Sequence, residues 1–527
     1  MKHMKVLSPK RMARYDEYAI KTWGIPSAVL MENAGRNTYR LMKERYLAGG
    51  ETIAVICGRG NNGGDGFVIA RYALIGGFRV RAYLIGRKSD LKGDAALNMG
   101  LFESLSGEVI ECVEKTKPVR TGIGEADIIV DAIFGTGLSK PVGGMEKTVI
   151  DAINASGKPV IAVDIPSGID GATGKALGSA VHGLHTFTYA YPKPGQVLSP
   201  GADHCGSLTV IDISIPSFVE KEVGFDGEIT DGDMMRGFLK RRLPSSHKGS
   251  FGHAVVIAGS PGKTGAAHMA SLAALKIGAG LVTLVIPETL NAILEAKTTE
   301  VMTYPVADDG RGFFIPGSFD EIATFVEDKD VVIMGPGLSQ NEGVMELVRR
   351  IYREIDKPFV IDADGINAFR GHTRLLKKKG GEAVLTPHPG ELARLIDKTP
   401  KEVNDDRMGT ALACARAWGV SILLKGAASV LATPDGQMFI NPTGNPSLAK
   451  GGSGDILTGF IGGLASQGYS LTRSTLLGAY LHGYMADTWV ENHSDMDLLA
   501  LDLVTGLGDA IEEIRNGTDR VYIERSL

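Results

Sequence analysis

Short apolar runs recur along the first part of the chain, and each is followed by a glycine-rich or polar stretch. An apolar stretch at 67–74, between the first two of these runs, has the character of a helix. Strands that alternate with helices are typical of a mostly parallel sheet with helices on its faces. We therefore predict an α/β domain whose strands lie at 52–57, 79–85, 127–133, 159–164, 185–191 and 207–215.

The pattern is interrupted at 216–232, where the sequence becomes charged and rich in turn-forming residues, and then it restarts. Helices are predicted at 265–277, 449–462 and 474–490, and strands at 253–258, 281–286, 330–334, 359–362, 383–386 and 421–425. Because 527 residues are too many for one ordinary domain, we predict two three-layer α/β/α domains. Their expected bounds are 1–222 and 223–527.

The composition narrows the class of protein. A hydrophobic share of 43% with 22% charged residues is typical of a globular enzyme, and a net charge of −5 gives no support for a nucleic-acid partner. The four cysteines have no CxxC spacing, which argues against a structural zinc and favours a reducing compartment. No apolar run is long enough to span a membrane, and no signal core is present. We expect a cytoplasmic protein without a membrane partner that acts on small molecules.

Two glycine-rich loops each end in an aspartate and open an apolar helix. The first runs from Gly58 to Asp65, and the second from Gly451 to Asp455. Glycines allow a ligand to approach the backbone closely, and the free N–H groups at a helix start attract phosphate. Phosphate would repel an aspartate beside such a site, so the carboxylate is expected to act on another group. The sequence thus predicts two sites for phosphate-bearing ligands.

Three loops of the first half, at 61–66, 132–138 and 164–171, leave the carboxyl ends of predicted strands, where α/β proteins bind ligands. The spacing of Gly58, Gly60 and Gly63 fits a dinucleotide fingerprint, but no ribose-binding acid follows, so this pattern is weak. Asp164 ends an apolar strand, and its partial desolvation suits acid–base chemistry. The alternative is that Asp164 only caps the next turn. Lys193 could assist Asp164 electrostatically or lie on the surface.

The motifs of this half, Asn61 to Gly66, Asp131, 135–137, 164–168 and 191–195, resemble the NAD(P)H-hydrate epimerase family. The resemblance implies a Rossmann-like fold and a potassium ion held by Asn62, Asp131 and Ser167. Oxygen ligands of this kind suit a weakly hydrated cation that would neutralise substrate phosphates. It also implies that the hydrated dinucleotide contacts Asn61, Asn62, Gly63, Gly64, Asp65, Gly135, Thr136, Gly137, Leu138, Ser139, Lys140, Pro141 and Asp164.

The second half contains Gly262-Lys263-Thr264 after a strand, but Ile257 stands where a P-loop needs glycine. The Gly452-Ser453-Gly454-Asp455 loop is more informative, because it resembles the anion-binding loop of ribokinase-like enzymes, whose aspartate deprotonates an acceptor hydroxyl. Base and anion site are then adjacent, as phosphoryl transfer requires. The alternative for Asp455 is a surface helix cap.

Around this loop, the segments 246–249, 335–338, 362–364, 386–391 and 425–427 resemble the ADP/ATP-dependent NAD(P)H-hydrate dehydratases, a ribokinase-like branch. This resemblance implies a site for ADP and Mg²⁺, and the fused two-domain chain favours ADP over ATP. The residues implied to contact the nucleotide are Lys425, Gly426, Ala427, Ala428, Ser429 and Gly454. Those implied to contact the hydrated dinucleotide are Ala266, Gly337, His388 and Asp455.

Two of these side chains have open alternatives. His388 lies between two prolines, so it is either presented to a ligand or satisfied within its loop. Glu391 either reaches Mg²⁺ or is a first-turn acid of the next helix.

Both resemblances together predict a bifunctional repair enzyme, an isomerase fused to a lyase. The first activity would interconvert the R and S hydrates of NADH and NADPH, and the second would dehydrate the S form at the expense of ADP, giving AMP and phosphate. The alternative is a C-terminal small-molecule kinase with a non-catalytic N-terminal binding module. Self-association into a homo-oligomer is expected from apolar helices near the C-terminus, if these are exposed.

Overall fold

The computed structural model describes residues 3–377, 382–517 and 520–526. It divides the chain into two compact units. The N-terminal unit contains Met4–Gly227, together with the C-terminal strand β19 (Glu524–Ser526), and the C-terminal unit contains Glu228–Tyr522. The expected bounds of 1–222 and 223–527 were chosen from composition alone, and they did not assign the last strand to the first unit.

The sheet of the N-terminal unit has the strand order β19-β8-β7-β6-β5-β2-β3-β4 in the described residues, and all neighbouring strands are parallel. This order confirms the predicted parallel α/β fold. The strands are β2 (Thr52–Cys57), β3 (Arg79–Ile85), β4 (Glu108–Cys112), β5 (Ile128–Ala132), β6 (Val160–Val163), β7 (His185–Tyr189) and β8 (Ser207–Ile211).

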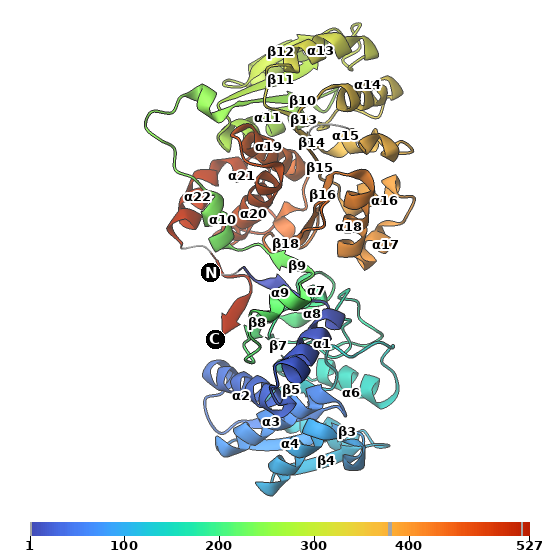
Figure 1. The fold of residues 1–527 in the computed structure, drawn as a ribbon, viewed down its shortest axis with the longest axis vertical. Helices are drawn as coiled ribbons and strands as arrows, with labels where there is room; N and C mark the ends of the chain where they lie inside the picture. The colour runs from blue at the N-terminus through green and yellow to red at the C-terminus, as the bar shows by residue number, and fades with distance from the viewer. Residues whose placement is uncertain (1–2, 378–381, 518–519, 527) are drawn as a thin grey trace. The chain divides into compact units, whose positions relative to one another are not determined.

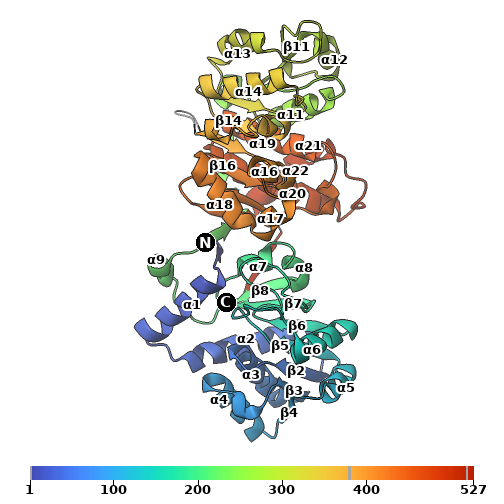
Figure 2. The same ribbon diagram turned by 90° about the vertical axis from the view of Figure 1, so that its right-hand side faces the viewer.

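Helices cover both faces of this sheet. On one side lie α2 (Ser27–Tyr46), α3 (Asn61–Ile75) and α4 (Gly93–Ser104), and on the other α5 (Lys117–Glu125) and α6 (Gly144–Ala155) (Figure 2). The alternation of strand side chains explains the two apolar layers, because Ile53, Val55 and Cys57 of β2 join the core on one face. Ala54 and Ile56 join the core on the other.

The sheet of the C-terminal unit has the order β9-β18-β17-β16-β15-β14-β13-β10-β11-β12 in the described residues. It is parallel except where β17 pairs with β16 and β18. Its strands are β9 (Gly227–Ile229), β10 (His253–Ile257), β11 (Leu281–Pro287), β12 (Met302–Val306), β13 (Val331–Met334), β14 (Phe359–Ile361), β15 (Ala383–Leu385), β16 (Ser421–Leu424), β17 (Ser429–Ala432) and β18 (Met438–Asn441).

Two layers of helices enclose this second sheet as well (Figure 1). One layer contains α11 (Thr264–Lys276), α19 (Ser453–Ser466) and α20 (Leu471–Trp489). The other contains α14 (Glu342–Glu354), α15 (Ala363–Asn367), α16 (Pro389–Leu395) and α18 (Arg407–Trp418). The predicted α/β/α layering is thus present in both units.

The long C-terminal helices α19 and α20 belong to the core, and most of their residues are buried. The expectation that they would be exposed was wrong, because they pack on the sheet and on each other. The prediction of self-association therefore loses the sequence feature on which it was based.

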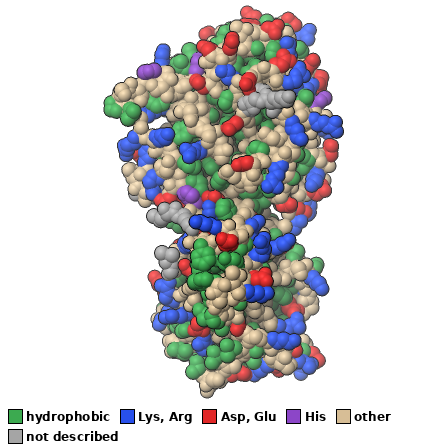
Figure 3. Space-filling view, viewed as in Figure 1, with side chains coloured by type: hydrophobic (Ala, Val, Ile, Leu, Met, Phe, Trp, Pro, Cys, Tyr) green, Lys and Arg blue, Asp and Glu red, His purple; other side chains and the backbone are tan. Residues whose placement is uncertain are grey.

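In the described residues, no helix is both long and apolar enough to cross a membrane. Lysine, arginine, aspartate and glutamate side chains are interspersed on the face that Figure 3 shows.

The pair α11 and α19 packs with its backbones very close. A Cβ atom on Gly459 of α19 would lie 2.2 Å from the carbonyl oxygen of Ala270 in α11, and one on Gly463 would lie 2.3 Å from that of Ala274. Only glycine fits at such a distance, so the helices would have to separate to accept any side chain. This contact positions the helix whose first turn carries Asp455.

We expect the Gly459→Ala substitution to lower the urea midpoint of unfolding by the equivalent of about 1–3 kcal/mol, since overpacking forces the helices apart. Gly237→Ala is the matched control, because a Cβ atom there meets open space in the helix α10 (Gly232–Phe238). This control should keep or slightly raise the midpoint. An unchanged midpoint for Gly459→Ala would contradict the tight contact.

Candidate functional site

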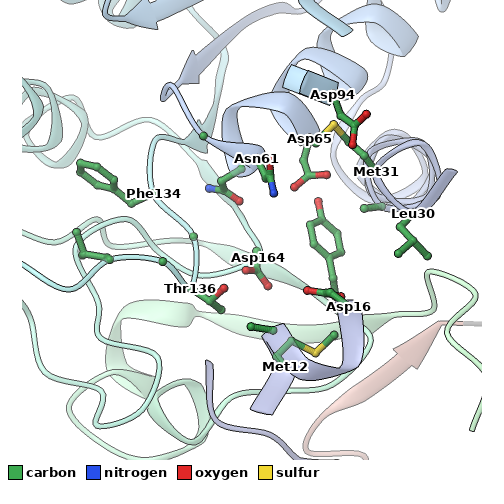
Figure 4. A pocket seen from close by; sticks show the side chains of 18 of the residues that line it. Met12, Asp16, Leu30, Met31, Asn61, Asp65, Asp94, Phe134, Thr136 and Asp164 are labelled. Atoms are coloured by element: carbon green, nitrogen blue, oxygen red, sulfur yellow. The ribbon is translucent and has the colours of Figure 1, made fainter. Parts of the chain in front are cut away.

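A cavity of about 710 Å³ lies at the carboxyl ends of β2, β5 and β6 in the N-terminal unit (Figure 4). Side chains from α1 (Pro9–Glu17), α2 and α3 complete its wall. The predicted substrate residues that line it are Asn61, Asn62, Asp65, Gly135, Thr136, Gly137, Leu138, Ser139, Lys140 and Asp164. These residues come from three separate loops, so the fold brings together most of the set that the sequence predicted for this half.

Gly63, Gly64 and Pro141 are not among the lining residues. The two glycines have a packing role instead. A Cβ atom on Gly63 would lie 2.0 Å from the carbonyl oxygen of Gly58, and one on Gly64 would lie 2.7 Å from the sulfur of Met31. They allow α3 to start directly beside the end of β2, which places Asn62 and Asp65 at the cavity. Contact of the two glycines and Pro141 with a substrate remains a prediction.

A buried ion pair lies at the centre of this cavity. Asp164 follows β6 with a positive φ of 63°, and its Oδ1 lies 2.5 Å from the Nζ of Lys193. The Lys193 side chain is 1% exposed, and it also donates to the hydroxyl of Thr188 at 2.8 Å and to the carbonyl of Tyr189 at 3.3 Å. The structure thus decides between the two alternatives for Lys193, because the lysine is held inside the site and does not lie on the surface.

The carboxyl groups of Asp16, Asp65 and Asp94 also line this cavity (Figure 4), and the first two interact with the charge of Asp164. Burial raises the pKa of Asp65 well above its ordinary value, and the charges of Asp164 and Asp16 add to this effect. Burial also raises the pKa of Asp16 to about 6, where the charge of Lys193 opposes the shift and that of Asp164 adds to it. The carboxyl groups of Asp164, Asp16 and Asp65 therefore share one lysine, and burial favours the protonated form of Asp65.

Sequence reasoning missed Asp16. It lies in a helix among charged neighbours, Arg14 and Glu17, where an acid is ordinarily a solvated surface residue. Only the packing of α1 against the cavity shows its position, and no local pattern would have indicated it.

Asp131 and Ser167 lie behind the cavity wall and contact each other directly. Asp131 is fully buried and accepts hydrogen bonds from the Ser167 backbone N–H at 2.8 Å, the Ser167 hydroxyl at 2.6 Å and the Ile133 N–H at 3.3 Å. Burial raises the pKa of Asp131 to about 6, although these hydrogen bonds oppose the shift. Among the residues that the structure describes, no lysine, arginine or histidine forms an ion pair with this carboxylate.

Asn62 is the third residue predicted for the potassium ion. Its side chain is 8% exposed, and its Nδ2 is buried without a hydrogen-bond partner in the described part of the chain. Its Oδ1 lies 3.3 Å from the place of a Cβ atom on Gly135, so it is directed towards the loop after β5. The Asp131 carboxylate, the Ser167 hydroxyl and the Asn62 Oδ1 are oxygen ligands of the kind that suit a hard monovalent cation, whereas the unpartnered Nδ2 is not a cation ligand.

In the C-terminal unit, the loop at 450–455 leads into the first turn of α19. Gly452 adopts a left-handed conformation with φ of 99°, and Asp455 occupies the first turn of the helix. Burial raises the pKa of Asp455 to about 7, with a further contribution from the charge of Asp362, while Lys425 opposes the shift. A surface cap would not be desolvated in this way, so the structure favours the acid–base interpretation over the alternative.

Asp362 and Lys425 form the second buried ion pair of the chain. Lys425 Nζ lies 2.7 Å from Asp362 Oδ1, and the hydroxyls of Thr386 and Thr458 donate to the same carboxylate at 2.7 and 2.9 Å. Although burial acts to lower the pKa of Lys425, the charges of Asp362, Glu391 and Asp455 outweigh it and raise this pKa. The sequence indicated Asp362 only as part of a motif, without assigning it a role.

Gly454 joins these groups into one site. A Cβ atom on Gly454 would lie 3.4 Å from Lys425 Nζ and 3.5 Å from Asp362 Oδ2. The predicted nucleotide residues Gly454 and Lys425 are therefore neighbours, and the predicted base Asp455 is the next residue of the chain. The lysine and the helix start together offer positive charge to a phosphoryl group beside this carboxylate.

Of the other predicted nucleotide residues, Gly426, Ala427 and Ala428 lie in the turn between β16 and β17, and Ser429 is the first residue of β17. Gly426 and Ala428 have positive φ values of 148° and 53°. The buried Arg407 supports this turn, because its guanidinium donates to the carbonyls of Ala427 and, at 3.2 Å, of Leu424. Sequence reasoning did not single out Arg407, since it resembles an ordinary helical arginine of α18.

Ala266 and Gly337 also come together, although they are far apart in the sequence. Gly337 has a positive φ of 65°, and a Cβ atom there would lie 3.2 Å from the Cβ of Ala266. Lys263 is also close to them, because its Cβ would lie 2.9 Å from the Cβ position on Gly337, and it forms an ion pair with Asp364 at 2.9 Å. Contact of Ala266 and Gly337 with a substrate remains a prediction.

His388 precedes α16 and is involved in capping it. Its Nδ1 accepts a hydrogen bond from the Gly390 N–H at 3.0 Å, while the Glu391 carboxylate accepts one from the His388 N–H at 2.9 Å. The His388 side chain is still 51% exposed, so it remains available to a ligand. Glu391 is nearly buried and acts as the first-turn acid, which was one of its two predicted roles.

Comparisons with known proteins agree with both halves of this description. The profile of a family described as "YjeF-related protein N-terminus" matches residues 27–195, and that of "NAD(P)H-hydrate dehydratase" matches residues 254–507. The bifunctional NAD(P)H-hydrate repair enzyme Nnr of Moorella thermoacetica is 39% identical over 98% of both chains. The chain belongs to the family of bifunctional NAD(P)H-hydrate repair enzymes.

The chain is also similar to two other proteins. The bifunctional NAD(P)H-hydrate repair enzyme Nnr of Thermofilum pendens is 35% identical over 98% of each chain. Among solved structures, the ADP/ATP-dependent NAD(P)H-hydrate dehydratase of Bacillus subtilis, co-crystallised with ATP and Mg²⁺, is 31% identical. That match covers 54% of this chain and 97% of the Bacillus chain, with a TM-score of 0.48.

We expect Lys193→Met to lower the rate of hydrate epimerisation by about 10²–10⁴-fold, the usual range for loss of acid–base function. Without the lysine, the buried Asp164 carboxylate loses its counter-charge and the contact that holds it in place. The measurement is the interconversion of R and S hydrates, with thermal unfolding as the check of the fold.

The double variant Lys193→Met with Asp164→Asn should epimerise the hydrates at nearly the same rate as either single variant. The reason is that the two side chains act as one unit. Lys147→Met, which removes an exposed lysine of α6, is the control and should keep the wild-type rate. Additive losses in the double variant would show that the two residues act independently.

Proposed function

We propose that the chain interconverts the R and S hydrates of NADH and NADPH in its N-terminal unit and dehydrates the S hydrate in its C-terminal unit, using ADP. Membership of the bifunctional repair family supports this pair of activities over a kinase with an inactive N-terminal module. The observation that carries the dehydratase assignment is the desolvated Asp455, next in the chain to the Gly454 N–H and close to Lys425.

The dehydration follows from the chemistry of these three residues. The Asp455 carboxylate accepts the proton of the hydrate's hydroxyl, and the hydroxyl oxygen attacks the terminal phosphoryl group of ADP, so that AMP leaves. Lys425 and the Gly454 N–H stabilise the charge that develops on the phosphoryl oxygens. The phosphate then leaves from the ring carbon, a proton is lost from the neighbouring carbon, and the ring double bond re-forms. Net products are the reduced nicotinamide, AMP and phosphate.

Mg²⁺ fits this site as a companion of the nucleotide. In the described residues, no group of three or more histidine, cysteine, aspartate or glutamate side chains is placed to hold a metal by itself. Mg²⁺ keeps several waters and binds largely through substrate phosphates, so the ADP would supply most of its ligands. The metal contributes neutralisation of phosphate charge.

For epimerisation, the carbon that carries the hydroxyl must lose and regain one of its bonds to oxygen or nitrogen. Both routes, ring opening and loss of water, need one group that accepts a proton and another that donates one. Asp164, paired with Lys193, is the proton acceptor in this proposal, and Asp65, whose protonated form is favoured by burial, is a suitable donor in the same cavity. Asn61 and the loop residues Gly135 to Lys140, which line the cavity, would hold the dinucleotide.

Potassium would be bound by Asn62, Asp131 and Ser167 and would place a positive charge behind the cavity loop. The uncompensated burial of Asp131 supports this assignment. A cytoplasmic location belongs to the proposal as well, as an expectation from the sequence.

The proposed role of Asp455 predicts that Asp455→Asn abolishes ADP-dependent recovery of reduced-nicotinamide absorbance, while epimer exchange continues at the wild-type rate. A carboxyl group with a pKa of about 7 is protonated below that pH and cannot act as a base. For the wild type, kcat/KM of dehydration should therefore rise with pH through about 7 and level off above it. Dehydration by Asp455→Asn at a rate near that of the wild type would remove the assignment.

The potassium site predicts that KCl raises the thermal unfolding midpoint of the N-terminal unit more than an equal concentration of tetramethylammonium chloride. A cation that binds only the folded state stabilises it by mass action, by about 2.7 kcal/mol at 100 times its Kd. Asp131→Asn should lose this difference, whereas Asp151→Asn, which changes an exposed carboxylate on α6, should keep it. Equal midpoints in the two salts for the wild type would count against the site.

A further inference from the structure

A histidine lies beneath the anion-binding loop of the C-terminal unit, and the mechanism above does not use it. His482 belongs to α20 and is 8% exposed. Its Nε2 lies 2.9 Å from the carbonyl oxygen of Ser453. A carbonyl oxygen only accepts hydrogen bonds, so the ring nitrogen must carry the proton and donate it. The contact therefore selects the tautomer with Nε2–H.

This imidazole is neutral at physiological pH. Burial lowers the pKa of His482 to about 4, and the nearby charge of Lys425 lowers it further, while the hydrogen bond to Ser453 has the opposite effect. A neutral ring close to a buried lysine costs no charge repulsion. It can therefore remain a hydrogen-bond donor over the whole range of pH in which Asp455 titrates.

The carbonyl that accepts this bond belongs to a particular peptide group. The carbonyl of Ser453 and the N–H of Gly454 are the two ends of one planar unit, so fixing the oxygen fixes the direction of the N–H. Donation to the oxygen also polarises the peptide and makes its N–H a stronger donor. Gly454 is the residue whose Cβ position lies 3.4 Å from Lys425 Nζ, so this N–H is next to the proposed phosphoryl site.

The Ser453–Gly454 peptide lies in the first turn of α19, where the chain enters the helix through glycines. Gly451 and Gly452 precede Ser453, and glycine permits many backbone conformations. Gly452, the residue before the helix, adopts a left-handed conformation with φ of 99°. The hydrogen bond from His482, on another helix, therefore adds to the helix geometry in fixing the orientation of this peptide.

We propose that His482 is a positioning residue of the dehydratase, which holds the Ser453–Gly454 peptide with its N–H directed at the terminal phosphoryl group of a nucleoside diphosphate. This inference rests on the proposed function, because it needs Gly454 and Asp455 at the reacting phosphoryl group. His482 touches neither substrate and acts only through the peptide.

The test compares His482→Gln with His482→Met, two side chains of similar length of which only glutamine can donate a hydrogen bond. Removing an oxyanion donor costs about 10²–10³-fold in kcat. Because the Gly454 N–H is only released and not removed, we expect about a tenfold loss of kcat in His482→Met. The KM for ADP should change much less, since the bond matters most for the charge that develops during transfer. His482→Gln should recover most of the rate.

His253→Met is the matched control. His253 is also a partly buried histidine of this unit, and its Nε2 lies 2.8 Å from the Thr283 hydroxyl, at the first residue of β10 and thus at the opposite end of the sheet. This variant should keep the wild-type kcat. Circular dichroism and thermal unfolding show which variants fold, and if His482→Met does not fold, His482→Leu takes its place as the variant without a donor.

The proposal is overturned if kcat stays within about twofold of the wild type in the variants without a donor, or if His482→Gln is as slow as they are. Asp455→Asn, measured alongside, separates this outcome from a failure of the proposed function. Activity in Asp455→Asn would mean that the reacting site has been misplaced. An inactive Asp455→Asn together with a fully active His482→Met would remove the positioning role alone.

Discussion

Each of the two sites is organised around a buried lysine that neutralises one aspartate at the carboxyl end of a parallel strand. The two pairs, Lys193 with Asp164 and Lys425 with Asp362, have N–O distances of 2.5 and 2.7 Å. Desolvation makes a buried ion pair costly to form, but removing one partner costs about 3–5 kcal/mol because the other charge is left alone. The strand ends and loops must therefore keep the lysine and the aspartate of each pair in contact.

These pairs also determine the protonation of the remaining acids. One lysine cannot compensate all the carboxyl groups that face it, and the surplus groups are buried as well. Asp65 and Asp16 consequently have raised pKa values in the first site, and Asp455 has one of about 7 in the second. Efficient proton transfer requires an acid whose pKa is close to neutral pH. In each site the single lysine pairs with one aspartate, and the other buried acids are left without a positive charge of their own.

Much of the fold was predictable from the sequence because it depends on local patterns. Runs of apolar residues located six strands in each of the two sheets, although β4, β9 and β12 were not predicted. The glycine loops located the helix starts that carry Asp65 and Asp455. The antiparallel strands β17 and β18 were not predicted, since they are short and follow a turn without apolar periodicity. Strand β19 is charged, and its Glu524 pairs with Thr209 of β8, which lies 315 positions earlier in the chain.

The residues that sequence reasoning missed act through contacts between distant segments. Asp16 reaches its cavity only because α1 packs there, Arg407 supports a turn 20 positions away, and His482 contacts a loop 29 positions before it. No spacing rule connects such pairs. Conversely, Gly63 and Gly64 fall in a motif that suggests ligand contact, yet their tight packing against Gly58 and Met31 already explains why glycine is required there. A motif therefore locates a site more reliably than it assigns a role to each of its residues.

The second site shows why a kinase-like set of residues can serve a lyase. A kinase and this dehydratase need the same base, anion-binding backbone and lysine for phosphoryl transfer. They differ in the acceptor, because an ester on a carbon next to nitrogen expels phosphate with help from the nitrogen lone pair. The protein then needs no separate acid for that departure. This agrees with the protein side of the site, where Asp362 is committed to Lys425, Thr386 and Thr458, and Asp455 is left as the group that titrates near neutrality.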